Sequence, residues 1–225
     1  MRNRKLRENI CVVGAGGQAR VVCSILLAQG YFNVVATIDI EPPEKPSTIF
    51  GIPIIGGDDS LRHLAKTGTR LGIVAIGNNA IRRAKYYNLL EVGLKAENAI
   101  HPSSHVSKSA GLQDGITIAP GAIVTTDVFL GANSIINSGA VIEHGSSVGK
   151  HSHIAPGAVV AGEVTIGEGA FVGIGAVLKE RISIGTGAII GAGSVILEDV
   201  PDNALVVGAP GKIIRFNSTP HATKK

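Results

Sequence analysis

Three histidines lie within ten residues of one another near the middle of the sequence: His144, His151 and His153. Imidazole titrates near neutral pH and is also a common metal ligand. The cluster could therefore bind a metal, supply an acid–base group, or consist of ordinary polar surface positions. His144 and His153 are nine residues apart in the sequence. Which of these roles is possible depends on how far apart the fold places their side chains.

A strict six-residue repeat surrounds these histidines. From Ile100 to Ile196 every sixth residue is Ile, Val or Leu, and the position four residues later is usually Ala, Ser or Val. This repeat is typical of a parallel β-helix in which three hexads form one coil and residues 18 apart stack on neighbouring coils, about 4.8 Å away. The narrow aliphatic interior accounts for a chain with 30 glycines, five Phe and no Trp. Glycine often follows the aliphatic residue, as at Gly131 and Gly149, where we expect it to serve a tight corner.

The six-residue period separates the histidines. His144 and His153 are half a coil apart, so within one subunit they lie on different faces or corners and cannot share a ligand. They could converge only between two copies of the chain, and β-helical prisms commonly form trimers. His151 and His153 share one side of a strand but complete no familiar ligand set, so we expect no metal and interpret His151 as a surface polar residue.

The N-terminal part has a different pattern. Residues 9 to about 97 alternate strands and helices: a strand before "GAGGQA", a helix ending near Gly30, a strand ending on Asp39, a proline-rich loop in "EPPEKPSTIFG", a short helix in "DDSLRHLAKTG", a strand in "LGIVAIGNN" and a last helix. This alternation predicts a Rossmann-like α/β domain with a parallel sheet and ligands at the carboxyl ends of its strands. We predict two domains, residues 1–97 and 98–225.

Composition and charge exclude several function classes. The net charge of +4 comes from the chain ends, because six of the 21 basic residues are Arg2, Arg4, Lys5, Arg7, Lys224 and Lys225. Without these six, acidic residues outnumber basic ones, which does not suggest nucleic-acid binding, and we expect solvated, frayed ends. Cys11 and Cys23 indicate buried free thiols, no apolar run reaches the length of a membrane span, and we expect a cytoplasmic protein.

Four collinear motifs carry a family resemblance: "GAGGQARVV", "IGNNAIRR", the long run beginning "NSGAVIEHGSSVGKHSHIAPG", and "VVGAPGKIIR". Across residues 9–216 they resemble the left-handed β-helix sugar acyltransferases. That family includes N-acetyltransferases of nucleotide-linked 4-amino-4,6-dideoxysugars, of the bacillosamine and perosamine type, and sialic acid O-acetyltransferases. The resemblance implies an acetyl-CoA co-substrate, a homotrimer with active sites between subunits, and a role in O-antigen or other surface polysaccharide biosynthesis.

The resemblance also assigns roles in the β-helix. His144 matches the general base that takes a proton from the sugar amine as it attacks the thioester, a contribution of about 10²–10⁴ in rate. His153 matches a histidine that contacts acetyl-CoA from the adjacent subunit. Backbone groups of Ile174 and Ala192 match positions that line the acetyl-CoA crevice.

Gly145 departs from the family pattern. Related enzymes usually carry Glu or Asp directly after the catalytic histidine, where it orients the ring. One coil before and one coil after Gly145 stand Asp127 and Glu163. Both should stack against Gly145, so we expect either of them to reach a ring nitrogen of His144.

The resemblance places the nucleotide portion of a sugar substrate on the N-terminal domain. The matching residues are Gly16, Gly17, Gln18, Asp39, Gly77 and Asn78, with Gln18 standing where histidine is common. By itself "GAGGQA" could present amides to a phosphate at a helix N-terminus, but it lacks the full dinucleotide fingerprint, and its glycines could simply serve a tight turn.

Two other functions stay open at this point. A sugar O-acetyltransferase of the sialic acid type would use the same base without needing a nucleotide. A non-catalytic β-helix binding protein could follow from loss of the carboxylate at position 145.

Overall fold

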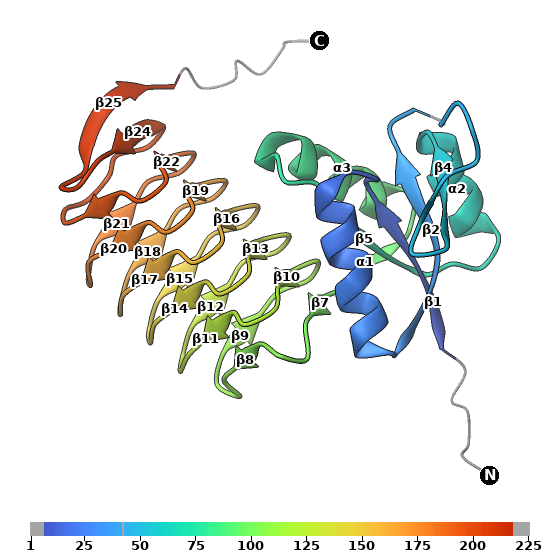
Figure 1. Ribbon diagram of the computed structural model, residues 1–225, viewed down its shortest axis with the longest axis horizontal. Coiled ribbons are helices and arrows are strands. Elements are labelled where there is room, and N and C mark those ends of the chain that lie inside the picture. Colours follow the sequence, from blue (N-terminus) through green and yellow to red (C-terminus); the bar gives the residue numbers. More distant parts are fainter. Residues whose placement is uncertain (1–6, 42, 218–225) are drawn as a thin grey trace.

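The structure, a computed structural model, describes residues 7–41 and 43–217, with nothing described for the side chain of Asp58. Of the basic residues near the chain ends only Arg7 falls inside this range, so the expectation of frayed ends lies outside the described residues. An α/β domain precedes a left-handed β-helix, which confirms the predicted fold class (Figure 1).

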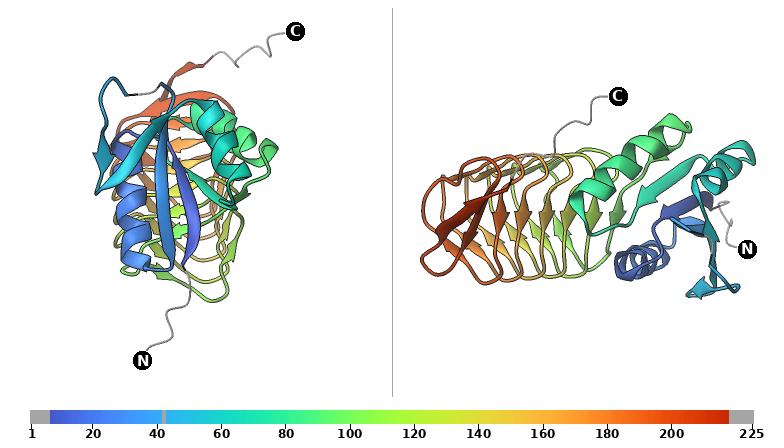
Figure 2. Two further views of the ribbon diagram at one scale, coloured as in Figure 1. Left: turned by 90° about the vertical axis from the view of Figure 1, so that its right-hand side faces the viewer. Right: turned by 90° about the horizontal axis from the view of Figure 1, so that it is seen from above.

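The α/β domain is built around a sheet with the strand order β3-β4-β2-β1-β5-β6. Its strands are β1 (Glu8–Val13), β2 (Phe32–Asp39), β3 (Thr48–Ile49), β4 (Ile52–Gly56), β5 (Leu71–Val74) and β6 (Lys95–Ala96). Its helices are α1 (Gly17–Gln29), α2 (Asp58–Lys66) and α3 (Asn79–Glu91). Because side chains alternate along a strand, Ile10 and Val12 pack toward α1, while Cys11 and Val13 pack with residues of α2 and α3 (Figure 2).

Most predicted elements of this domain are present. Gly30 ends α1 with a left-handed φ of 70° and donates its N–H to the Leu26 carbonyl, as expected for a helix C-terminus. The proline-rich stretch was wrongly expected to be loop throughout. Its last residues form β3, which turns through Phe50 and Gly51 into the missed strand β4. Pro53 is tolerated in β4 because the parallel ladder with β2 begins one residue later, at Ile54.

The β-helix is a triangular prism whose three faces are parallel sheets of two-residue strands (Figure 2). Face 1 holds β7 (Ala99–Ile100), β10 (Thr117–Ile118), β13 (Ile135–Ile136), β16 (His153–Ile154), β19 (Phe171–Val172) and β22 (Ile189–Ile190). Face 2 holds β8 (His105–Val106), β11 (Ile123–Val124), β14 (Val141–Ile142), β17 (Val159–Val160), β20 (Val177–Leu178) and β23 (Val195–Ile196). Face 3 holds β9 (Gly111–Leu112), β12 (Phe129–Leu130), β15 (Ser147–Val148), β18 (Thr165–Ile166) and β21 (Ser183–Ile184).

Residues 18 apart pair between coils, as Val141 does with Val159, and no loop interrupts the strands from β7 to β23. Both expectations are confirmed. The second residue of most strands points inward and is buried, and burial of each such aliphatic side chain stabilises the prism by about 1.5–3 kcal/mol. Strands β24 (Ala204–Val207) and β25 (Lys212–Phe216) form an antiparallel pair that extends face 1 at the C-terminal end.

The glycines that follow the inward aliphatic residues are needed for a reason other than the one expected. Gly131 and Gly149, which follow inward aliphatics, do not have positive φ. A Cβ at Gly131 would lie 2.5 Å from the backbone nitrogen of Lys150 on the next coil, and one at Gly149 would lie 2.6 Å from that of Glu168. These glycines therefore allow neighbouring coils to approach, while the left-handed corners fall at other positions.

Three columns of left-handed residues mark the corners. Corner 1–2, between faces 1 and 2, contains residues 121, 139, 157, 175 and 193; corner 2–3 contains 127, 145, 163 and 181; corner 3–1 contains 115, 133, 151, 169 and 187. The α/β sheet ends at Ala96 and face 1 begins at Ala99.

Candidate functional site

His144 lies on corner 2–3, where the chain leaves β14 and turns through Gly145, whose φ is 66°. Its carbonyl accepts from the Glu163 N–H at 2.8 Å, and its side chain is exposed. A Cβ on Gly162, one coil further on, would lie 2.7 Å from both Cε1 and Nε2 of the imidazole. The ring therefore rests on the bare backbone of Gly162, and no described group hydrogen-bonds to its nitrogens.

The residues expected to replace a carboxylate at position 145 do stack around it. The Gly145 N–H donates to the Thr126 carbonyl at 3.1 Å, and a Cβ at Gly145 would lie 3.4 Å from Cγ of Glu163. Asp127 and Glu163 themselves occupy left-handed corner positions, with φ of 57° and 59°.

The Glu163 carboxylate forms an ion pair with the Arg181 guanidinium. Arg181 donates from Nε at 2.9 Å and from Nη2 at 3.3 Å to its two carboxylate oxygens. These hydrogen bonds and the charge of Arg181, with a smaller contribution from His144, lower the pKa of Glu163, so the carboxylate stays ionised. Among the described contacts, neither Glu163 nor Asp127 hydrogen-bonds to the His144 ring.

His153 lies elsewhere, on β16 of face 1, and is 7% exposed. The Asn137 amide accepts from the Ser138 N–H through Oδ1 at 2.8 Å, so its NH₂ group faces Nε2 of His153 at 3.1 Å. Nε2 is then the acceptor, and the proton sits on Nδ1, which faces the Gly77 carbonyl at 3.4 Å. Burial, helped by the charge of Arg82, lowers the pKa of His153 to about 4, which keeps it neutral.

His151 is buried, contrary to its interpretation as a surface residue. It is 1% exposed on corner 3–1, where its ring lies 5.5 Å from those of Tyr86 and Tyr87 on α3. Burial lowers its pKa to about 4. The repeat places His151 at the outside of the prism, but helix α3 covers that corner.

Five of the six residues predicted to bind the nucleotide sugar line one cavity of about 220 Å³ at the carboxyl ends of β1, β2 and β5. They are Gly16, Gly17, Gln18, Asp39 and Gly77. The sixth, Asn78, does not line this cavity and instead caps α3 by accepting from the Ile81 N–H at 3.0 Å.

Neither backbone conformation nor packing within the protein requires glycine at three positions of this cavity. Gly16, Gly17 and Gly77 lack positive φ, and a Cβ on any of them would meet no atom within 4 Å. Gly14 is different, because its φ is 121° and a Cβ there would lie 2.6 Å from the Ala75 carbonyl oxygen. Bare backbone facing open space favours close approach by a ligand.

Two polar features lie beside the same cavity. Helix α1 begins without a side-chain cap, so its first N–H groups are free to meet an anion. Gln18 Nε2 is buried and has no hydrogen-bond partner in the described part of the chain. A buried donor without a partner costs free energy, and a ligand with acceptor oxygens would satisfy it.

Ile174 and Ala192, predicted to line the acetyl-CoA crevice, stack on corner 1–2. Both are exposed, Ile174 by 61%. His144 lies on corner 2–3, so face 2 separates it from these two residues. Five of the six outward positions of face 2 form an apolar row, while the sixth, on β8, is His105. The row consists of Ile123, Val141, Val159, Val177 and Val195.

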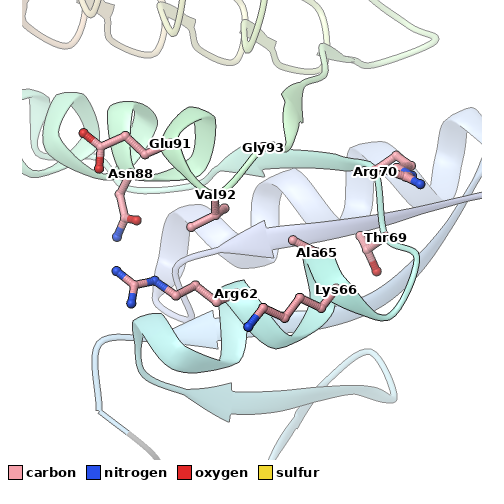
Figure 3. Close-up of a pocket in the computed structure, with 9 residues that line it drawn as sticks. All are labelled: Arg62, Ala65, Lys66, Thr69, Arg70, Asn88, Glu91, Val92 and Gly93. Carbon is pink, nitrogen blue, oxygen red and sulfur yellow. The ribbon is translucent and has the colours of Figure 1, made fainter.

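A larger cavity of about 590 Å³ lies at the opposite edge of the α/β sheet (Figure 3). Its basic residues, Arg62, Lys66 and Arg70, surround the C-terminal ends of α2 and α3, where cations offset the helix dipoles. Thr69 and Arg70 precede β5, whereas Gly77 follows it, so this cavity is not part of the glycine-lined one.

Two other kinds of site are absent from the part of the chain that the structure describes. No three His, Cys, Asp or Glu residues converge in a way that could hold a metal ion. No helix of residues 7–41 or 43–217 is long and apolar enough to cross a membrane.

Comparison with known proteins places the chain in a family. Residues 9–89 match the PglD N-terminal domain, and residues 127–162 and 163–198 match the bacterial transferase hexapeptide (six repeats). A structure of a single-residue mutant of perosamine N-acetyltransferase from Caulobacter crescentus, in complex with CoA and GDP-perosamine, is 36% identical with a TM-score of 0.88, over 91% of this chain and 96% of that one. The chain belongs to the left-handed β-helix sugar N-acetyltransferases.

Further matches agree with this membership. The acetyltransferase domain of PglB from Neisseria gonorrhoeae is 32% identical with a TM-score of 0.86, over 92% of this chain and all of that one. A second structure of that domain, in complex with acetyl coenzyme A, is 33% identical with a TM-score of 0.85 over 92% of this chain. No curated protein matches the sequence significantly. This N-acetyltransferase is therefore an acetyl-CoA-dependent acyltransferase of sugar amines.

The sequence reasoning missed two residues. Gly162 could have been found, because the 18-residue step from His144 leads to it. Arg82 could not, because its fully buried contacts join two domains, and no sequence period connects them.

Proposed function

We propose that this N-acetyltransferase acetylates the 4-amino group of a nucleotide-linked 4-amino-4,6-dideoxysugar, with His144 as the general base. The observation that carries the proposal is the exposed imidazole of His144, supported on Gly162 and free of hydrogen bonds from described groups to its nitrogens. An imidazole in this state can take the proton of an attacking amine near neutral pH.

The reaction balances with the groups at hand. The neutral amine forms a C–N bond to the acetyl carbonyl carbon, the C–S bond breaks, and CoA leaves as the thiol. The surplus proton of the nitrogen passes to the His144 imidazole and from there to solvent or the leaving thiolate. Placing amine, thioester and base together supplies much of the rate.

The glycine-lined cavity is the proposed nucleotide-sugar site. Gly16, Gly17 and Gly77 leave their backbones open to a ligand, the N-terminus of α1 faces phosphate oxygens, and Gln18 Nε2 supplies a donor. Asp39 at the end of β2 lines the same space. Asn78, which caps α3, would act through its backbone or by fixing the turn at residues 75–78 between β5 and α3, called the Gly77 turn below.

The proposed acetyl-CoA site lies between subunits of a homotrimer. Ile174 and Ala192 lie on corner 1–2 and His144 on corner 2–3, so a neighbouring copy must supply one of the two sets. The apolar row on face 2, with Val177 42% exposed, is suited to burial against another copy. His153, which the family resemblance places at acetyl-CoA, lies on face 1 beside the Gly77 turn.

We also propose that Glu163 or Asp127 replaces the carboxylate missing at Gly145 as a positioning group for His144. Glu163 has the stronger support, because its Cγ lies 3.4 Å from the site of the missing side chain and its charge interacts with His144. The reaction would serve surface polysaccharide synthesis, and a cytoplasmic location stays a prediction.

A substrate panel tests the reaction. UDP-, GDP- and dTDP-linked 4-amino-sugars are mixed with acetyl-CoA and free thiol is measured, with the free amino-sugars and sialic acid as controls. We expect thiol release with at least one nucleotide-linked amine and none with free sugars. Release with sialic acid alone, or with no acceptor, contradicts the proposal.

Complementation tests the site between subunits. His144→Ala removes the base and Ala192→Phe blocks the acetyl-CoA crevice, so each variant alone should be inactive. If the two residues serve one site from different subunits, co-expressed mixtures regain part of the activity. Mixtures that stay inactive, although mass measurement shows mixed trimers, contradict a shared site.

A further inference from the structure

Arg82 is a buried cation that lies where the two domains meet. It stands on α3 and is 0% exposed, and burial lowers its pKa to about 10, so it stays protonated at neutral pH. All its described hydrogen bonds go to backbone carbonyls and one amide oxygen, with no carboxylate among them. A buried charge needs such partners to offset its lost hydration.

The contacts of Arg82 divide between the two domains. Nη1 donates to the carbonyls of Ile76 at 3.0 Å and Gly77 at 3.1 Å, in the turn that lines the glycine-lined cavity. Nε donates to the Asn133 carbonyl at 3.0 Å, and Nη2 donates to the His151 carbonyl at 2.7 Å. Asn133 and His151 stack on corner 3–1, so one planar guanidinium joins the turn to two coils of the β-helix.

Two neighbouring contacts strengthen this junction. Asn79 accepts from Nη2 of Arg82 at 2.8 Å, and its own amide donates to the Gly169 carbonyl at 2.9 Å, on the coil of corner 3–1 that follows His151. The Gly77 carbonyl also faces His153 Nδ1 at 3.4 Å. The position of the Gly77 turn is therefore determined by the β-helix and not by the α/β domain alone.

We propose that Arg82 is a positioning residue that fixes the Gly77 turn of the nucleotide-sugar site against corner 3–1 of the β-helix. It touches neither the proposed substrate nor the base. Because the guanidinium is planar, it sets the spacing between the cavity that holds the nucleotide and the prism that carries His144. The inference rests on the proposed function for the identity of the substrate, the nucleotide sugar. The contacts of Arg82 do not depend on that function.

The test compares two adjacent substitutions of the same kind. Arg82→Lys keeps the charge but replaces the fork of N–H donors by one ammonium, which cannot reach both domains. Arg83→Lys is the matched control, because Arg83 also joins the domains, by a 3.2 Å ion pair to Glu168, but through exposed side chains. Amide hydrogen exchange of residues 75–78 and the KM for each substrate are measured.

We expect Arg82→Lys to accelerate exchange of the turn about tenfold or more and to raise KM for the nucleotide sugar about tenfold, with KM for acetyl-CoA within twofold. Arg83→Lys should change neither quantity. Equal effects on both KM values, or unchanged exchange, overturn the proposal. If Arg82→Lys does not fold, Asn79→Ala must show the same KM separation to a smaller degree, and its absence also overturns it.

Failure of the proposed function gives a different result. In that case the wild-type protein releases no thiol with any nucleotide-linked amine. The exchange rates of the turn in the two lysine variants still decide whether Arg82 fixes it.

Discussion

Corners 2–3 and 3–1 of the β-helix have the same backbone but opposite environments. Gly145 and His151 occupy equivalent left-handed positions, with φ of 66° and 60°. On corner 2–3 the side chains of His144 and Glu163 are exposed. On corner 3–1 helix α3 covers His151, whose pKa falls to about 4. The repeat places the residues, and the covering element decides whether an imidazole remains available for proton transfer.

The largest expected effect is the loss of His144. His144→Ala should reduce kcat for acetyl transfer by about 10²–10⁴ and leave the thermal midpoint nearly unchanged, because the side chain is exposed. Thiol-release kinetics and a melting curve measure the two quantities. A variant with unchanged turnover would show that corner 2–3 is not the catalytic one.

The next prediction compares a glycine that supports the His144 ring with a glycine that allows two coils to approach. Gly162→Ala places a methyl group 2.7 Å from the His144 ring, so the ring must move, and kcat should fall by about 10²-fold with little loss of stability. Gly131→Ala places its methyl group 2.5 Å from backbone and should lower the melting temperature instead. Kinetics and melting curves of both variants test this contrast, and identical behaviour would contradict it.

Buried histidines should make stability depend on pH. His151 and His153 have folded-state pKa values of about 4, against about 6.5 in an unfolded chain. Between about pH 4 and 6.5 the unfolded state binds more protons than the folded state, so the free energy of unfolding rises with pH. The contribution of these histidines to stability is therefore lost as the pH falls from about 6.5 toward 4. The slope is at most about 1.4 kcal/mol per pH unit for each histidine.

Urea unfolding at pH 7.5, 6 and 5, at one protein concentration, measures this slope. His151→Phe removes one proton site between Tyr86 and Tyr87 and should flatten the dependence. His144→Phe, on the exposed corner, is the matched control. If both variants keep the wild-type slope, burial on corner 3–1 does not control protonation.

The smallest effect concerns the carboxylates beside Gly145. If either carboxylate orients the His144 ring, the double variant Asp127→Asn with Glu163→Gln should change the pH–kcat profile. Arg181→Gln, which frees Glu163 from its ion pair, should also change the profile. An unchanged profile in the double variant contradicts a positioning role for these residues.

The six-residue period was sufficient to predict the prism and the separation of its histidines. A six-residue period of inward aliphatic residues predicts a parallel β-helix, because stacked coils bury these side chains in a continuous apolar core. From that period followed the strand positions, the different locations of His144 and His153, and the stacking of Asp127 and Glu163 on Gly145. The turn at Gly16 and Gly17 followed equally from strand–helix alternation.

Which element covers each face of the prism depends on domain packing and could not be predicted from local patterns. No period relates α3 to corner 3–1, so the burial of His151 and the contacts of Arg82 depend on how two separate domains pack. Strand β4 was not predicted because it is defined by pairing with β2, a segment that is not adjacent to it in the sequence. Local pattern fixes the position of a residue within its own repeat, whereas the solvation and hydrogen bonding that set its chemistry come from whichever element packs against it.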